Sequence, residues 1–368
     1  KYSDPAIYCF LTLKNMKVLY AVSEAKPFIA SGGLGDVAGS LPAALRKRLI
    51  GCRVVMPLYE GIPEKFKAEM KFITHITVPV AWRRQYCGIF ELRKDGVIYY
   101  FLDNEYYFKR DSIYGHYDDA ERFAFFSRAV MEIIPEIDFK PDVIHCNDWQ
   151  TALVPVYYST MYAQKPGYEN IKTVFTIHNI QYQGKYGKDL LEEVVGLSPY
   201  DANVIEYDDC VNFMKGAIET ANKITTVSPS YANEILDPWY SHGLDPILCQ
   251  RAWKLQGILN GIDVDNYNPE TDKNIVKNYD VKTVKKGKAE NNHHGDGHHL
   301  GRSHLQNITA QQTRYNIACT AGEGSNHEDN LPLMCGVYVD LHILQIGDGV
   351  HGIYSRLQYT SHHKYRQV

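Results

Sequence analysis

A glycine-rich stretch near the start of the chain has the composition of a turn that binds anions or sugars. It reads FIASGGLGDVAGSLPAAL over residues 28–45 and places Gly32, Gly33 and Gly35 at the start of an amphipathic segment. Glycines at such a turn let the backbone approach a ligand with no Cβ atom in between. The first N–H groups of a following helix favour negative charge. The stretch therefore suits a phosphate or a sugar oxygen.

Two other interpretations of this stretch remain open. Residues 33–38 match the dinucleotide pattern G-x-G-x-x-A, and Glu60 lies near the expected acidic position. However, that pattern should follow its strand directly, whereas a segment containing Pro27 intervenes, and Asp36 would place a carboxylate beside the pyrophosphate. The glycines could also serve helix packing alone.

Further polar and aromatic side chains follow three short apolar segments. Asp148 and Trp149 follow the first, His178 and Asn179 end the second, and Asn260 follows the third. One such cluster would mean little, because polar residues commonly terminate strands. Several of them together with the glycine turn indicate one polar site.

Carboxylates in the same region allow a different enzyme class to be considered. A glycosidase needs two carboxylates flanking the bond that it cleaves, and Asp36 and Asp148 could take those roles, although nothing else in the sequence supports them. The Asp263-Val264-Asp265 triplet imitates the D-x-D metal motif of some sugar transferases. Its position after Asn260 favours a surface turn, so we expect no metal site.

These side chains need a scaffold, and the sequence predicts a parallel sheet. Short segments rich in Val, Ile and aromatic residues alternate with helical patterns, such as residues 121–134, which Pro135 ends. Ser228 and Pro229 supply a helix start. Alternating β and α elements favour an α/β fold in which ligands bind beyond the carboxyl ends of the strands. The predicted strands are 17–22, 53–56, 142–146, 172–178, 223–227 and 256–259.

The composition excludes several other classes of protein. The chain has 368 residues, 45% of them hydrophobic, and a net charge of −4, so it has no electrostatic footprint for nucleic acid or an anionic membrane. No apolar run reaches the roughly 20 residues of a membrane span. The eight cysteines include no C-x-x-C pair, which is typical of reduced thiols. We therefore expect a cytoplasmic protein that binds neither nucleic acid nor membranes.

The motifs as a group resemble a known enzyme family. They are KVLYAVSEAKPFIASGGLGDVAGSLPAAL, YGHYDDAERFAFFSRA, PDVIHCNDWQTAL, TVFTIHNIQYQG, ITTVSPSYANEI and GILNGIDVDNYNPETD. In this order they resemble the bacterial glycogen synthases and plant starch synthases, glycosyltransferase family 5. The resemblance implies a GT-B fold with two Rossmann-like domains. It also implies transfer of glucose from ADP-glucose, or UDP-glucose in some relatives, to the non-reducing end of an α-1,4-glucan with retention. The nucleotide sugar is a substrate, and neither a cofactor nor a metal is implied.

The resemblance also assigns roles at the donor side of the site. Gly32 and Gly33 would approach the donor phosphates, and Asp36 would hold donor or acceptor hydroxyls. Asn260 matches the asparagine of the family's N-G-[VI]-D motif. The family motif K-[TV]-G-G-L has a lysine where this chain has Ala30, so a cation expected near the donor is replaced.

The remaining assignments concern the reacting glucose. His178 and Asn179 match the H-N pair beside it, and Asp148 and Trp149 match the D-W pair that holds sugar hydroxyls and packs the cleft. Tyr114 matches an active-site tyrosine in a Y-G motif. Of these, His178, Asp148 and Asn179 are the predicted catalytic residues.

The resemblance covers only part of the chain. We expect a non-family extension at 1–15, a Rossmann-like catalytic domain on the acceptor side at 16–272, a linker at 273–290, and an aberrant tail at 291–368 that is frame-shifted or disordered. The tail lacks the family's R-L-x-x-Q-K-G segment, whose cations neutralise the diphosphate, so the second Rossmann-like domain is expected to be essentially missing. The alternative function is therefore a truncated, non-catalytic glucan-binding or inert fragment of such a synthase.

Overall fold

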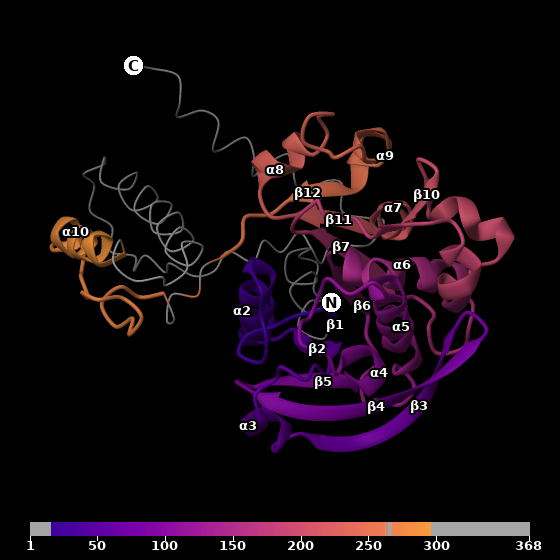
Figure 1. The fold of residues 1–368 in the computed structure, drawn as a ribbon, viewed down its shortest axis with the longest axis horizontal. Helices are drawn as coiled ribbons and strands as arrows, with labels where there is room; N and C mark the ends of the chain where they lie inside the picture. Colours follow the sequence, from indigo (N-terminus) through magenta and orange to yellow (C-terminus); the bar gives the residue numbers. More distant parts are fainter. Residues whose placement is uncertain (1–15, 262, 264–266, 296–368) are drawn as a thin grey trace, which may run out of the picture. The chain divides into compact units, whose positions relative to one another are not determined.

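The computed structural model describes residues 16–261, 263 and 267–295, which divide into two units after Asn260. Figure 1 shows the course of the chain, coloured from indigo to yellow. The predictions for residues 1–15, for Val264 and Asp265, and for the tail from residue 296 lie outside the described residues. Within the described part, no helix has both the length and the apolar character needed to cross a membrane.

The first unit is built on a nine-stranded sheet, most of which is parallel. Its strands from β12 to β5 run parallel, and β5, β4 and β3 pair antiparallel. The spatial order is β12 (Leu255–Gly257), β11 (Lys223–Thr226), β7 (Lys172–Ile177), β6 (Val143–Asn147), β1 (Lys17–Ala21), β2 (Gly51–Pro57), β5 (Val97–Asp103), β4 (Arg83–Lys94) and β3 (Lys71–Val80).

All six predicted strands are present in the parallel part of this sheet, which confirms the predicted α/β fold class. Strands β1, β2, β6, β7, β11 and β12 overlap the predicted segments. The sequence analysis did not identify β3, β4 and β5. At the β4–β5 turn, Asp95 and Gly96 both have positive φ values of 50° and 77°, which is the backbone that an Asp-Gly hairpin turn favours.

Helices pack around the sheet, and the longest of them also confirm the predictions (Figure 1). The glycine-rich stretch leads into α2 (Gly33–Lys47), and the predicted helix at 121–134 is α5 (Asp119–Glu132). Ser228 caps α8 (Pro229–Glu234) through its hydroxyl, which accepts the Tyr231 N–H. The other helices of this unit are α3 (Glu64–Lys67), α4 (Glu105–Phe108), α6 (Leu153–Tyr157), α7 (Phe213–Thr220) and α9 (Asp245–Gln250).

The remaining elements are short. A second sheet joins β8 (Lys185–Tyr186), β10 (Cys210–Asn212) and β9 (Glu206–Tyr207). In the second unit the structure describes the helix α10 (Val284–Gly295), where Gly287 lies against the ring of Tyr279. This helix spans the end of the predicted linker and the first residues of the predicted tail.

The strand order defines where a ligand should bind. From β1 the chain goes first to β2 on one side, and the later strands β6 and β7 lie on the other side of β1. In open parallel sheets, ligands bind beyond the carboxyl ends of the strands at such a reversal of order. The loops after β1, β6 and β7 therefore form the region where the predicted residues should meet.

Candidate active site

Asp148 directly follows β6 and ties that strand end to the next one. Its Oδ1 accepts hydrogen bonds from the backbone N–H groups of His178, at 2.7 Å, and Asn179, at 3.3 Å. The residue is 9% exposed and has a φ of +56°, an unfavourable backbone conformation for a non-glycine residue that often marks functional sites. No hydrogen bond within the described residues uses Oδ2, so that oxygen can bind a ligand.

Burial raises the pKa of the Asp148 carboxyl to about 7, and the two backbone hydrogen bonds oppose this rise. The carboxyl therefore exchanges its proton near neutral pH. Such a group can accept a hydrogen bond when ionised and donate one when protonated, which suits the recognition of sugar hydroxyls.

His178 is held as a neutral imidazole by the same strand ends. Its Nε2 lies 3.0 Å from Oδ1 of Asn147, which also accepts the Tyr20 hydroxyl at 3.0 Å. The Asn147 amide nitrogen donates to the carbonyl of Ala21, so its oxygen must face His178 and Nε2 must carry the proton. Burial lowers the pKa of His178 to about 4. Its Nδ1 is thus left as an acceptor for a hydroxyl.

Asp148 should make the free energy of unfolding depend on pH in a way that asparagine does not. Its pKa is near 7 in the folded chain and about 3.9 in the unfolded chain. Between these values the folded state binds the extra proton, so the contribution of Asp148 to stability falls as pH rises from about 4 to 7. Because the asparagine Oδ1 can keep both backbone hydrogen bonds, Asp148→Asn should gain on the order of 2–4 kcal/mol relative to wild type over this interval. Urea unfolding at pH 5 and pH 8 measures the difference, and a pH-independent difference would contradict it.

Glu24, which the sequence analysis did not single out, holds the glycine turn in place. Its carboxylate accepts the backbone N–H of Ser31 at 2.6 Å, the Ser31 hydroxyl at 2.7 Å and the Gly35 N–H at 3.2 Å. Burial raises the pKa of this carboxyl, against the effect of these hydrogen bonds. A carboxylate three residues after β1 was the available sequence signal.

The glycines of the turn fall into two groups. A Cβ atom built on Gly35 would lie 2.3 Å from Cβ of Ala30, and one on Gly39 would lie 2.8 Å from the carbonyl oxygen of Lys26. These two glycines serve close packing. In contrast, a Cβ atom on Gly32 or Gly33 would meet no described heavy atom within 4 Å. Helix packing therefore explains Gly35 and Gly39, whereas Gly32 and Gly33 present bare backbone to open space.

Tyr114 reaches the end of β1, just before the glycine turn, from a distant part of the sequence. Its hydroxyl lies 2.6 Å from that of Ser23, the neighbour of Glu24. Burial and the nearby Glu24 carboxylate raise the pKa of Tyr114 well above its ordinary value. The phenol therefore stays neutral and lies within electrostatic reach of Asp148, which also contributes to this rise.

The other predicted residues occupy different surroundings. Asp36 lies in the first turn of α2 and pairs with Lys26, whose Nζ is 2.5 Å from its Oδ1. Trp149 is buried, with its ring 5.1 Å from that of Phe123 in an edge-on arrangement. Asn260 lies beyond β12, the outermost strand, and no hydrogen bond within the described residues ties it to the rest of the group. Residues from the β1, β6 and β7 ends thus meet, and the place of Asn260 in the site stays a prediction.

The chain is similar in sequence to proteins of a known family. The family model of the starch synthase catalytic domain matches residues 17–250. Glycogen synthase from Exiguobacterium sibiricum is 53% identical over 281 residues, which cover 75% of this chain and 58% of that protein. Glycogen synthase from Geobacillus thermodenitrificans is 53% identical over 270 residues, covering 73% and 56%.

A solved structure agrees. The catalytic domain of starch synthase IV from Arabidopsis thaliana, bound to ADP and acarbose, superposes with a TM-score of 0.68 at 33% identity, covering 76% of this chain and 58% of that one. The chain thus spans 56–58% of the length of these relatives. The match over residues 17–250 shows that the chain belongs to the starch synthase catalytic domain family, glycosyltransferase family 5.

Proposed function

We propose that the chain acts as a glycogen (starch) synthase, a hexosyltransferase that moves glucose from ADP-glucose to the non-reducing end of an α-1,4-glucan with retention. The single observation that carries this proposal is the hydrogen-bonded junction of Asp148 with His178 and Asn179 beside the glycine turn. The family membership supports it, as does the related starch synthase bound to ADP and acarbose. The free thiols among the described residues suit a cytoplasmic setting.

The donor diphosphate is proposed to bind at Gly32 and Gly33. The N-terminus of α2 carries partial positive charge and unpaired N–H groups, and the open space at these two glycines lets a phosphate approach the backbone. Asp36 in the first turn of α2 is proposed to hold a hydroxyl of donor or acceptor. We propose that these groups, with no resident cofactor or metal, receive the nucleotide sugar as substrate.

The reacting glucose is proposed to lie against the ends of β6 and β7. Oδ2 of Asp148 and Nδ1 of His178 are suited to bind its hydroxyls, with Asn179 and Tyr114 alongside. The buried Trp149 ring packs against Phe123 beneath this region. Holding the sugar in one orientation lowers the entropic cost of reaction. Preorganised dipoles then stabilise the charge that develops as the diphosphate leaves. Asn260 is proposed to contribute only from the edge of this site.

Transfer of radiolabelled glucose to glycogen tests the proposal and its alternative together. The full chain is incubated with labelled ADP-glucose or UDP-glucose, with and without EDTA. Incorporation from ADP-glucose that survives EDTA is the expected result. Glucan binding without incorporation would instead support the non-catalytic glucan-binding alternative, and the absence of both would reject the proposal.

A further inference from the structure

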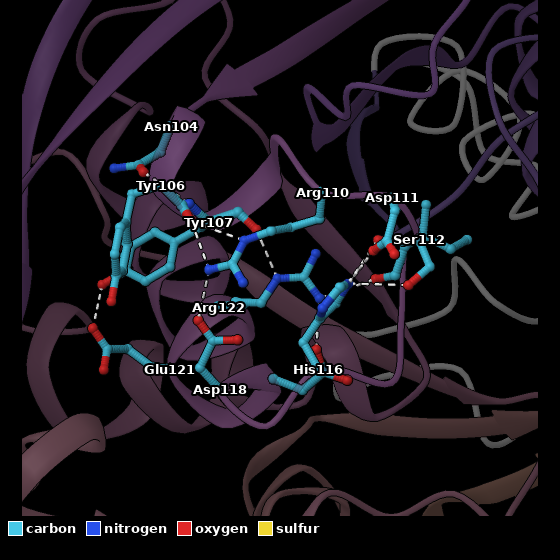
Figure 2. Close-up of polar contacts among 12 residues, drawn as sticks. Asn104, Tyr106, Tyr107, Arg110, Asp111, Ser112, His116, Asp118, Glu121 and Arg122 are labelled. Carbon is cyan, nitrogen blue, oxygen red and sulfur yellow. Dashed lines mark hydrogen bonds and ion pairs between the residues drawn. The ribbon is translucent and has the colours of Figure 1, made fainter.

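A buried ion pair on α5 contacts the Tyr114 loop, which we define as residues 112–116. Arg122 has no exposed surface, and its Nη1 lies 2.5 Å from Oδ1 of Asp119, one turn earlier on the helix. Its Nε donates to the carbonyl of Tyr107 at 2.7 Å, as Figure 2 shows among the polar contacts of this region. The pair thus joins α5 to the segment that leads into the loop.

The same pair holds the backbone on both sides of Tyr114. Nη1 of Arg122 donates to the carbonyl of Ile113 at 3.2 Å, and Oδ2 of Asp119 accepts the N–H of Gly115 at 2.8 Å. Tyr114 lies between these two contacts, and its hydroxyl meets Ser23. Fixing the backbone at positions 113 and 115 therefore fixes where the phenol can reach.

A second, more exposed set of contacts closes the base of the loop (Figure 2). Arg110 donates to the carbonyl of Tyr106 at 2.7 Å and pairs with Asp118 at 2.9 Å. The Ser112 hydroxyl lies 3.0 Å from Nε2 of His116. The loop is thus held by the buried Arg122–Asp119 pair and, at its base, by these more exposed contacts.

Stability alone is a weak explanation for the buried pair. Transferring two charges from water costs free energy that the attraction between them often fails to recover, and an apolar pair of similar volume is often as stable. In addition, Nη2 of Arg122 is buried and has no hydrogen-bond partner among the described residues. Departures of this kind from complete hydrogen bonding are expected at functional sites, where a residue is kept because it holds its neighbours in a particular position.

We propose that Arg122, acting with Asp119, is a positioning residue that sets Tyr114 against Ser23, next to the Glu24 that holds the glycine turn, and so determines affinity for ADP-glucose. This inference rests on the proposed function. Arg122 is fully buried, so its effect on a ligand passes through Tyr114 to Ser23 and Glu24.

The test compares Arg122→Met with Arg128→Met in the full chain. Arg128 is a matched control because it also lies on α5, pairs with Glu132 and stacks on the ring of Tyr157, and none of its side-chain partners within the described residues lies in residues 112–116 or 31–35. Amide hydrogen exchange should show faster exchange over residues 112–116 and 31–35 in Arg122→Met and not in Arg128→Met. Unchanged exchange in both segments would overturn the proposal, whether or not the chain binds ligand.

ADP-glucose affinity, measured by calorimetry, provides the functional readout. Arg122→Met should weaken it about tenfold, equivalent to about 1.4 kcal/mol, whereas Arg128→Met should leave it unchanged even if both variants unfold at lower temperature. In a Tyr114→Phe background the effect of Arg122→Met should shrink, because both substitutions remove the same interaction. Full additivity would overturn the proposal. A wild-type chain that binds no ADP-glucose would reject the proposed function, and the exchange data would then still show whether Arg122 positions the backbone around Tyr114.

Discussion

Replacing His178 with alanine should lower glucosyl transfer by about 100-fold or more while the chain remains folded. The substitution removes Nδ1, the acceptor that the Asn147 contact leaves available, and the glucosyl group then loses orientation as well as a hydrogen bond. Because the pKa of His178 is lowered to about 4, the loss should be the same across pH 6–8.

His75→Ala is the control for this prediction. His75 is an exposed histidine that stacks against Tyr86. It lies on β3, the edge strand that is far from β7 in the order of the sheet. The glucosyl-transfer activity of His75→Ala should match that of the wild type. Retention of more than about half of the wild-type rate by His178→Ala would contradict a role at the reacting glucose, since a lost transition-state contact lowers kcat and kcat/KM together.

Replacing Gly33 with valine should weaken ADP-glucose binding at least about tenfold, or about 1.4 kcal/mol, without lowering the unfolding temperature. A Cβ atom at this position meets no described atom within 4 Å, so we expect the fold to accommodate valine. The same side chain would project into the space where we place the diphosphate and would block the approach of the backbone.

Gly35→Ala should lower the stability of the fold, in contrast to Gly33→Val. Its Cβ atom would lie 2.3 Å from Cβ of Ala30, so this variant should lose stability through overpacking, by about 1–3 kcal/mol. Calorimetric titration with ADP-glucose and thermal unfolding of both variants measure the contrast. Undiminished ADP-glucose affinity in Gly33→Val would show that the diphosphate does not bind at this turn.

Much of the scaffold could be predicted from sequence because the parallel strands are short, apolar and regularly separated by helices. Strands β3, β4 and β5 were missed although the Asp95-Gly96 turn between β4 and β5 is a strong hairpin signal. The six predicted strands show β-α alternation, and an antiparallel extension of a parallel sheet does not show that alternation. The strand order, which places the site between β1 and β6, also required the structure.

The polar site was predictable only in part. Asp148, His178 and Asn179 were identified from their positions after strands, and the structure joins them by hydrogen bonds. Asn147 and Glu24 lie within the quoted motifs but were assigned no role, because their contacts depend on partners brought close only by folding. No local pattern reveals that Asn147 contacts Tyr20, which is far away in sequence. The place of Asn260 also depends on the fold, since β12, the strand that precedes it, lies two positions beyond β7 in the sheet.

A crystal structure of the full chain soaked with maltoheptaose and ADP would test the proposed site most directly. We expect a glucose ring within about 3 Å of Nδ1 of His178 and Oδ2 of Asp148, with the diphosphate against Gly33. A sugar bound elsewhere, with both of these side chains free of it, would show that the strand-end cluster is structural and does not bind the reactants.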